Sequence, residues 1–216
     1  MSRKAGTFEQ FKNYTLAIAR GERTVDPSEP KVWYEQIEGD EPETLPAATL
    51  DSSDYTHSTL RERIVEHVFI GDALRELWRL GITDVEVLRS EFDAGGYDLV
   101  MSYRKIVRHI QFKTAMEHGK AANVKVSLKL MEKPAGCVIW IVVSPRLDLV
   151  SFCWFGGAAP DMPLPDITHF TKAKHNKGNA EGTKIERPGH RIVPRNRFEH
   201  LGTLDEVLHR LFGPLP

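Results

Sequence analysis

The chain lacks several features that would place it in a protein class at once. It has 2 cysteines among 216 residues, and neither stands in a Cys-x-x-Cys or paired Cys/His spacing, which argues against a zinc site. No apolar run approaches the ~20 residues that a membrane helix needs. The first residues hold no apolar block like that of a secretion signal. We therefore expect a cytoplasmic protein that makes no membrane contact.

An excess of charge of one sign is also missing. The 29 lysines and arginines nearly balance the 30 acidic residues, and the net charge is −1. No global field therefore attracts nucleic acid or a membrane surface. The two thiols, Cys137 and Cys153, each lie in an apolar run typical of a strand, which predicts buried and reduced cysteines.

The composition divides the chain into an extension and a domain. Thr7 is placed to cap a short helix that ends near Gly21, and a stretch rich in proline and acidic residues follows it. We predict that residues 1–56 form this N-terminal helix and an extended linker. Residues 57–216 are long enough for one domain with its own core.

Hydrophobic periodicity and capping signals predict two helices in this domain. Residues 57–80 form the clearest helical pattern, which Gly81 ends. At the other end of the domain, Thr203 and Glu206 have the spacing of a capping box at the start of a terminal helix.

The remaining periodic segments predict strands. Residues 121–133 fit either a strand or a short helix, and both stay open. Residues 156–200 are loop-rich and basic. Strands are expected at 85–88, 98–103, 106–114, 136–144 and 149–155. The sum is an α/β domain with a mixed sheet.

The stretch HIQFKTA, residues 109–115, places polar groups on one face of a predicted strand. Gln111 and Lys113 are two residues apart and therefore share that face. If the hairpin turns symmetrically about residues 104–105, Asp98 lies directly across from Gln111, at about 5 Å. The opposite face carries Ile106, Arg108, Ile110 and Phe112.

The first helix adds a carboxylate in line with an apolar stripe. At about 100° per residue, Glu66 falls on the stripe of Phe69, Ala73, Leu77 and Leu80, with Glu62 one turn earlier. Such a carboxylate needs a partner or a metal, or it lies at the wet end of the stripe and pairs with Arg61, Arg63 or solvent. A second apolar stripe, Leu60, Ile64, Val68 and Trp78, predicts that protein covers the helix on two sides.

A helical glutamate, then GYDLV, then a strand with Q-x-K resembles the PD-(D/E)xK nuclease superfamily, which includes restriction endonucleases and Holliday-junction resolvases. The resemblance covers Leu60 to Thr114 and extends in part to Val143. The chain is also similar to uncharacterised bacterial proteins that share the GYDLV, RHIQ-x-K and GCVIW segments. The resemblance implies a restriction endonuclease-like mixed sheet flanked by helices.

The resemblance also implies a set of site residues. The superfamily's aspartate matches Asp98, its lysine matches Lys113, and its helical glutamate matches Glu66. Gln111 stands where the family has an acid, and a neutral amide weakens the binding of a hard cation. The implied metal is Mg²⁺ or Mn²⁺, held by Asp98, Glu66, the Gln111 amide and the carbonyl of Phe112, with Lys113 as the catalytic cation.

A local basic segment favours a nucleic-acid partner, DNA in the first place, and a homodimer is possible because many nucleases of this type pair to cut two strands. A solvated loop is the alternative for this segment. Its cationic residues are Lys172, Lys174, Lys177, Lys184, Arg187, Arg191, Arg195 and Arg197.

The leading hypothesis is a metal-dependent endonuclease that hydrolyses phosphodiester bonds in DNA. The alternatives are a catalytically weak or inactive nucleic-acid-binding or regulatory module on the same fold, and an interaction protein of a defence or toxin–antitoxin type. Glu91 and Asp93 are further metal-ligand candidates, although a turn explains them equally. His109 is either a proton shuttle or a hydrogen-bonding strand residue.

Overall fold

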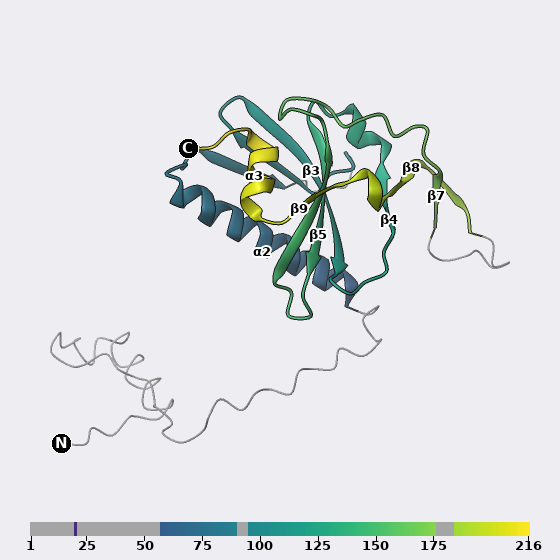
Figure 1. Ribbon diagram of the computed structural model, residues 1–216, viewed down its shortest axis with the longest axis horizontal. Coiled ribbons are helices and arrows are strands. Elements are labelled where there is room, and N and C mark those ends of the chain that lie inside the picture. The colour runs from purple at the N-terminus through teal and green to yellow at the C-terminus, as the bar shows by residue number, and fades with distance from the viewer. Residues whose placement is uncertain (1–19, 21–56, 90–94, 176–183) are drawn as a thin grey trace, which may run out of the picture. The chain divides into compact units, whose positions relative to one another are not determined.

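A mixed six-stranded sheet organises the part of the chain that the structure describes. This computed structural model describes residues 20, 57–89, 95–175 and 184–216, and all but Arg20 belong to the unit Leu50–Pro216. The strand order is β1-β2-β3-β5-β6-β9 (Figure 1). The strands are β1 (Val85–Arg89), β2 (Leu99–Tyr103), β3 (Ile106–Met116), β5 (Gly136–Val143), β6 (Leu149–Gly156) and β9 (Glu199–Leu201). The α/β class with a mixed sheet is thus confirmed.

The centre of the sheet is its one parallel pair, β3 with β5, and the other neighbours are antiparallel. β5 is buried along its whole length, as its unbroken apolar run predicts for a strand covered on both faces. Cys137 on β5 and Cys153 on β6 are free and buried, as expected. β3 is longer than its neighbour β2, and this difference in length positions the candidate site.

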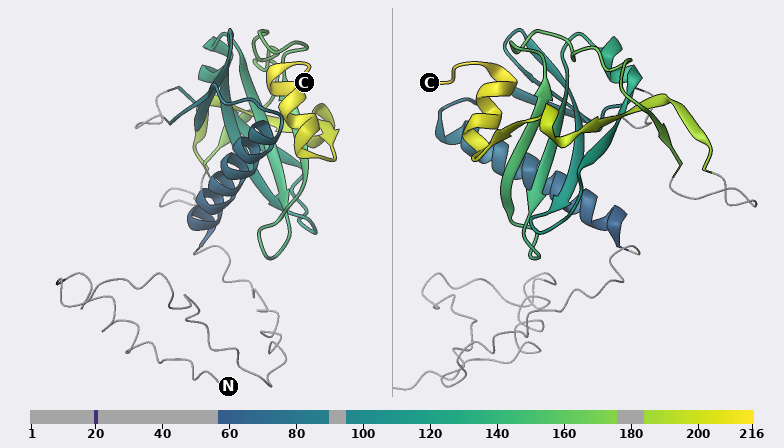
Figure 2. Two further views of the ribbon diagram at one scale, coloured as in Figure 1. Left: turned by 90° about the vertical axis from the view of Figure 1, so that its left-hand side faces the viewer. Right: turned by 45° about the vertical axis from the view of Figure 1, so that its right-hand side comes forward.

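Two helices cover one face of the sheet. They are α2 (Ser58–Arg79) and α3 (Leu204–Phe212), and Figure 2 shows both on the same side of the strands. The larger core lies between them and the sheet, where Phe69 meets Phe112 edge-to-face with ring centroids 5.0 Å apart. Among the described residues, no helix is long and apolar enough to cross a membrane.

A second, three-stranded sheet covers part of the opposite face, with the order β4-β8-β7. Its strands are β4 (Asn123–Ser127), β8 (Glu186–Pro194) and β7 (Lys172–Lys174). Figure 1 shows β7 and β8 reaching away from α3. Segment 121–133, left open between strand and helix, contains both: β4 is followed by the 3₁₀-helix η2 (Leu128–Glu132).

Residues 156–200, which we expected to be loop-rich and basic, also contain strands that the sequence did not predict. They contain β7, β8, the 3₁₀-helix η3 (Arg195–Arg197) and most of β9. The sequence does not predict β8 because this strand contains Pro188 and Gly189, and both residue types normally argue against a central strand. They are tolerated because the β7–β8 register shifts between Lys172 and Ala173, which leaves this part of β8 in an irregular stretch.

The expectation that protein covers α2 on two sides is wrong. The stripe with Phe69, Ala73 and Leu77 is buried, as predicted. The second stripe faces outward: Leu60 is 58% exposed, and Trp78 is 70% exposed. One sheet face offers room for only one side of a helix, so apolar character alone did not bury the other side.

Arg108 is buried with the apolar residues of its strand face, at 0% exposure. Its Nε donates to the carbonyl of Leu211 at 2.9 Å, and its Nη2 donates to that of Arg210 at 2.7 Å. The predicted capping box of Thr203 and Glu206 closes the other end of α3. Arg108 therefore satisfies the C-terminal carbonyls of α3 and ties this helix to the middle of the sheet.

We predict that Arg108→Ala lowers the free energy of unfolding by about 3 kcal/mol, because it leaves buried carbonyls without donors and opens a cavity. Urea denaturation with an unchanged m-value measures this loss. Lys105→Ala, at the exposed hairpin tip, is the control and should change stability by less than about 0.5 kcal/mol. A loss below about 1 kcal/mol for Arg108→Ala would contradict the anchoring role.

Burial raises the pKa of the Cys137 thiol to about 12, although the nearby Arg108 lowers it. A raised folded-state pKa stabilises the fold below the unfolded pKa of about 8.5, and this contribution is lost as the pH rises toward 12. We predict that the stability advantage of the wild type over Cys137→Ala shrinks between pH 8 and pH 10.5, as measured by urea denaturation. An advantage independent of pH would contradict the burial of this thiol.

Candidate active site at the end of strand β2

The candidate site lies where β2 begins and β3 continues past it. Their register runs from Tyr103 opposite Ile106 to Leu99 opposite Ile110, so the hairpin is symmetric about residues 104–105. Beyond Ile110, β3 is paired with β5 only, among the strands that the structure describes. One edge of β3 is therefore open to side chains from elsewhere.

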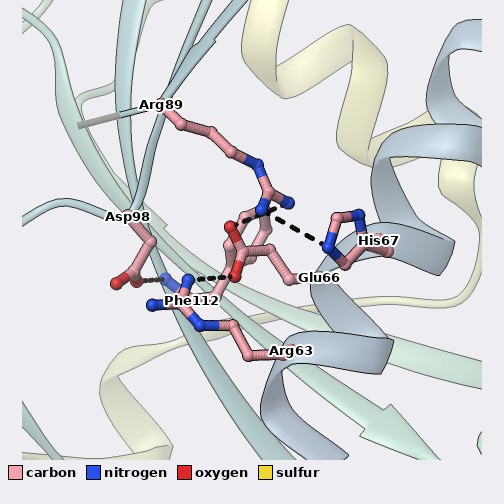
Figure 3. A network of polar contacts seen from close by, with 6 residues as sticks. All are labelled: Arg63, Glu66, His67, Arg89, Asp98 and Phe112. Carbon is pink, nitrogen blue, oxygen red and sulfur yellow. Dashed lines mark hydrogen bonds and ion pairs between the residues drawn. The ribbon is translucent and has the colours of Figure 1, made fainter. Parts of the chain in front are cut away.

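Asp98 stands at this opening. Its N–H donates to the carbonyl of Ile110 at 2.8 Å, one residue short of Gln111, which the symmetric register would place across from Asp98. The predicted symmetric register is thus confirmed as far as Leu99 opposite Ile110, and the pairing shifts by one residue at Asp98. The Oδ2 of Asp98 then accepts the N–H of Phe112 at 2.7 Å, so a carboxylate takes the place of the next strand carbonyl (Figure 3).

The same hydrogen bond orients a backbone carbonyl. In a strand, the N–H and C=O of one residue point to the same side. Because the N–H of Phe112 points toward Asp98, the carbonyl of Phe112 is directed into the same opening. The Asp98 carboxylate and the Phe112 carbonyl are therefore two oxygen donors at one edge of the sheet.

A glycine allows the segment before Asp98 to pack closely against Ser127. Gly96 has φ +71°, in the left-handed region that favours glycine. A Cβ at this position would lie 2.5 Å from the Cβ of Ser127, a distance that no side chain tolerates. The GGYD segment therefore needs this glycine in order to pass η2 and present Asp98 to β3.

A cavity of about 310 Å³ joins the open edge of β3 to the first half of α2. Lys113 and Asp98 both line it, as their shared strand face predicts. Thr59, Glu62, Arg63 and Glu66 of α2 form one wall, and Asn123 and Trp140 lie in another. This cavity is the candidate active site, and we refer to it as the active-site pocket.

Gln111 is the predicted site residue that the pocket does not include. It is 8% exposed, and its Oε1 has no hydrogen-bond partner among the described residues. Strand alternation places it on the same face as Lys113, two residues before this pocket residue, and its unpaired amide oxygen is not part of the pocket wall.

Glu66 lies in the pocket wall, but arginines hold its carboxylate. It is 5% exposed, and its Oε2 accepts a hydrogen bond from Nη1 of Arg63 at 3.1 Å. Nη2 of Arg89 lies 3.1 Å from Oε1, an ion pair without the alignment of a hydrogen bond. Figure 3 shows Arg63 reaching from α2 toward the strand that carries Phe112. These contacts favour the alternative in which Glu66 pairs with arginine.

His109 shares the strand face of Gln111 but does not line the pocket. Its ring meets that of Tyr97 edge-to-face with centroids 5.0 Å apart. Burial, and then the charge of Lys133, lowers the pKa of His109. A neutral imidazole packed on an aromatic ring fits a structural role better than a proton shuttle.

The donor set of the pocket suits a magnesium ion only in part. Among the described residues, no three His, Cys, Asp or Glu side chains form a group that could hold a metal ion. Mg²⁺, however, is usually bound by one or two carboxylates, several waters and the phosphates of its substrate. Asp98 with the carbonyl of Phe112 meets this lower requirement. Glu91 and Asp93 lie outside the described residues.

The basic residues predicted to bind nucleic acid separate into two groups. Arg191 bonds to the carbonyls of Thr168, Pro188 and His190, and Arg197 lies over the ring of Phe170 at 5.8 Å. These two are tied to the fold. Arg195 is held in the same way as Arg197, with its guanidinium over the ring of Trp140 at 5.3 Å. The others that the structure describes are Lys172, Lys174, Lys184 and Arg187, and Lys177 lies outside the described residues.

Sequence reasoning offered Arg63 as a partner of Glu66 but overlooked the roles of Arg89 and Lys125. Arg63 stands three residues before Glu66, which is the spacing of helix neighbours, so one signal was present. Arg89 ends β1 and comes to Glu66 only through the tertiary fold. Lys125 alternates with the buried Val124 and Val126, which places it on the outer face of β4.

We predict that Arg63→Ala/Arg89→Ala destabilises the fold by about 2 kcal/mol, because it leaves a buried carboxylate without cations. Glu66→Gln should cost less, because the freed arginines are already 63% and 36% exposed and find water. Urea denaturation of both variants tests the asymmetry, with the exposed pair variant Arg75→Ala/Arg79→Ala as the control. Equal losses in all three would contradict it.

Comparison with known proteins found no relative: no family model, no curated protein and no solved structure matches the chain. The fold and the site geometry are therefore the ground on which a function is inferred.

Proposed function

We propose that this protein is a metal-dependent nuclease of the PD-(D/E)xK type that hydrolyses phosphodiester bonds in DNA. The observation that carries the proposal is the opening where β2 stops beside β3, with Asp98 and Lys113 in one pocket. The order of a helix, an antiparallel hairpin and a parallel neighbour supports a restriction endonuclease-like fold.

Each residue of the pocket has a task in this proposal. Asp98 and the carbonyl of Phe112 hold a Mg²⁺ or Mn²⁺ ion, which, when bound, supplies Lewis acidity and lowers the pKa of its water. The amide oxygen of Gln111, buried and without a described partner, completes the donor set from the adjacent position. Phosphodiester hydrolysis adds water to phosphorus and releases an alcohol and a phosphate monoester.

Cations of the pocket stabilise the charge that develops on the phosphate oxygens. Lys113 lies in the pocket from β3, and its ammonium group is a point charge suited to a phosphate oxygen. Arg63 lies in the wall from α2, with its guanidinium oriented by the buried Glu66. In this assignment, Glu66 is a positioning residue, and metal ligation by Glu66 requires that it exchange its arginine partners.

A second candidate function is nucleic-acid binding without turnover. It is favoured by the charge count at the ligand positions, because Gln111 is neutral and Glu66 is engaged by two arginines. Fewer free carboxylates weaken the hold on a hard cation. In this case the protein binds DNA with a strong salt dependence and leaves it intact.

We predict that the purified protein cuts plasmid or labelled linear DNA with Mg²⁺ or Mn²⁺ and that EDTA stops the reaction. Asp98→Asn should reduce the rate about 100-fold or more, because the amide lacks the charge of the ligand, yet its oxygen still accepts the Phe112 N–H and keeps the strand end in place. Lys113→Met should reduce it similarly.

Matched controls are Asp84→Asn and Lys105→Met, which remove the same charges from exposed positions outside the pocket. Both should cut at the wild-type rate. Cleavage that persists in Asp98→Asn and Lys113→Met would show a contaminating nuclease or another active site. DNA binding without cleavage in either metal would favour the second candidate.

A further inference from the structure

A second cavity, of about 430 Å³, lies on the small sheet and is lined mainly by cationic side chains. We call this surface the basic hollow. Its ammonium groups come from three separate elements: β4, β7 and the segment before β8. They are those of Lys125, Lys172, Lys174 and Lys184. The near-zero net charge of the chain therefore conceals a local positive surface.

Lys125 shows how closely these cations are gathered. Its Nζ donates to the backbone carbonyl of Lys174 at 2.7 Å, which holds it in the hollow. Burial, and then the charges of Arg187 and Lys184, lowers the pKa of Lys125. The nearby carboxylate of Glu186 pairs with Lys172 at 3.4 Å. Cations that repel one another in this way gain stability from a bound anion.

Strand β4 connects the basic hollow to the active-site pocket. Asn123 lines the pocket, and Lys125 lines the hollow. They are two residues apart on the outer face of β4, because Val124 and Val126 point into the core. The distance along the strand is about 7 Å, which is about the separation of two consecutive phosphates along a nucleic-acid strand.

Arg195 places one more cation beside this connection. Its guanidinium lies over the ring of Trp140 at 5.3 Å, and Trp140 lines the active-site pocket. The backbone N–H of Arg195 donates to the carbonyl of Ala122, which fixes η3 to the start of β4. Positive charge is thus present at the pocket, along β4 and in the hollow.

We propose that the phosphates of a polynucleotide strand pass from the active-site pocket along the outer face of β4 into the basic hollow. This rests on the proposed function and specifies its substrate class: a polymer that carries at least one further phosphate to one side of the cleaved bond, rather than a mono- or dinucleotide. The hollow binds the backbone, so it contributes affinity without base specificity.

Fluorescence anisotropy of the full chain in EDTA tests this path separately from cleavage. The probes are a fluorescein-labelled single-stranded 20-mer and its duplex, titrated at several salt concentrations. Lys125→Gln/Lys174→Gln should weaken binding about tenfold and reduce the slope of log K against log salt by about 1.4 to 1.8, because two phosphate contacts are lost. Circular dichroism confirms that the variant is folded.

The matched control is Arg104→Gln/Lys105→Gln, which removes two exposed cations at the β2–β3 turn, away from both cavities. It should leave affinity and slope unchanged. An equal effect of both double variants would overturn the path, because it would reduce the binding to general electrostatics. Wild-type affinity in Lys125→Gln/Lys174→Gln would overturn it as well.

Two further measurements identify the ligand and keep the proposals apart. Labelled polyglutamate that binds as tightly as DNA, with the same loss in the hollow variant, would overturn the nucleic-acid assignment. If the wild type cuts DNA and the hollow variant binds normally, the path is wrong and the nuclease proposal stands. If the hollow variant loses binding while no metal supports cleavage, the path stands and the nuclease proposal fails.

Discussion

The site depends on one hydrogen bond, from the N–H of Phe112 to the carboxylate of Asp98. A strand that continues beyond its neighbour carries backbone groups that need partners, and leaving them buried and unpaired is costly. Here the N–H of Phe112 lies beyond the start of β2 and has no strand carbonyl opposite it, so the side chain of Asp98 accepts its hydrogen bond. The same bond holds a carboxylate at the opening and directs a backbone carbonyl into it. The polar character of the pocket therefore follows from the unequal lengths of two strands.

The electrostatics of the pocket follow from unequal burial. Glu66 is almost fully buried, whereas its partners Arg63 and Arg89 reach solvent. The carboxylate depends on the arginines more than they depend on it, because water solvates the arginines but not the glutamate. Arg63 is consequently held at the wall of the pocket by Glu66, and the rest of its side chain is exposed to solvent. The result is a cavity in which an acid and an amine from the strands face a cation from the helix.

The small sheet gives the domain its second polar surface. Its inner residues, among them Val126 and Val193, pack against the central sheet, so the outer residues of β4 are presented on a rigid support. β4 contributes to both cavities because alternate residues of one strand share a face. Without this strand, the pocket and the basic hollow would be unrelated features of the surface. With it, the two cavities are linked by alternate residues of a single strand.

Local patterns in the sequence determined the strand faces, the register and the helix ends. The two-residue period put Gln111 and Lys113 together, and the short turn at residues 104–105 gave a symmetric register that runs to Leu99 opposite Ile110. The capping box of Thr203 and Glu206 formed as predicted, because its partners lie within one helical turn.

Tertiary packing decided the rest. The partners of Glu66 include Arg89 from a distant strand, the outer stripe of α2 is exposed despite its apolar character, and β8 formed despite Pro188 because β4 and β7 pair with it. Contacts between residues far apart in the chain leave no period or spacing in the sequence, so only the folded arrangement shows them.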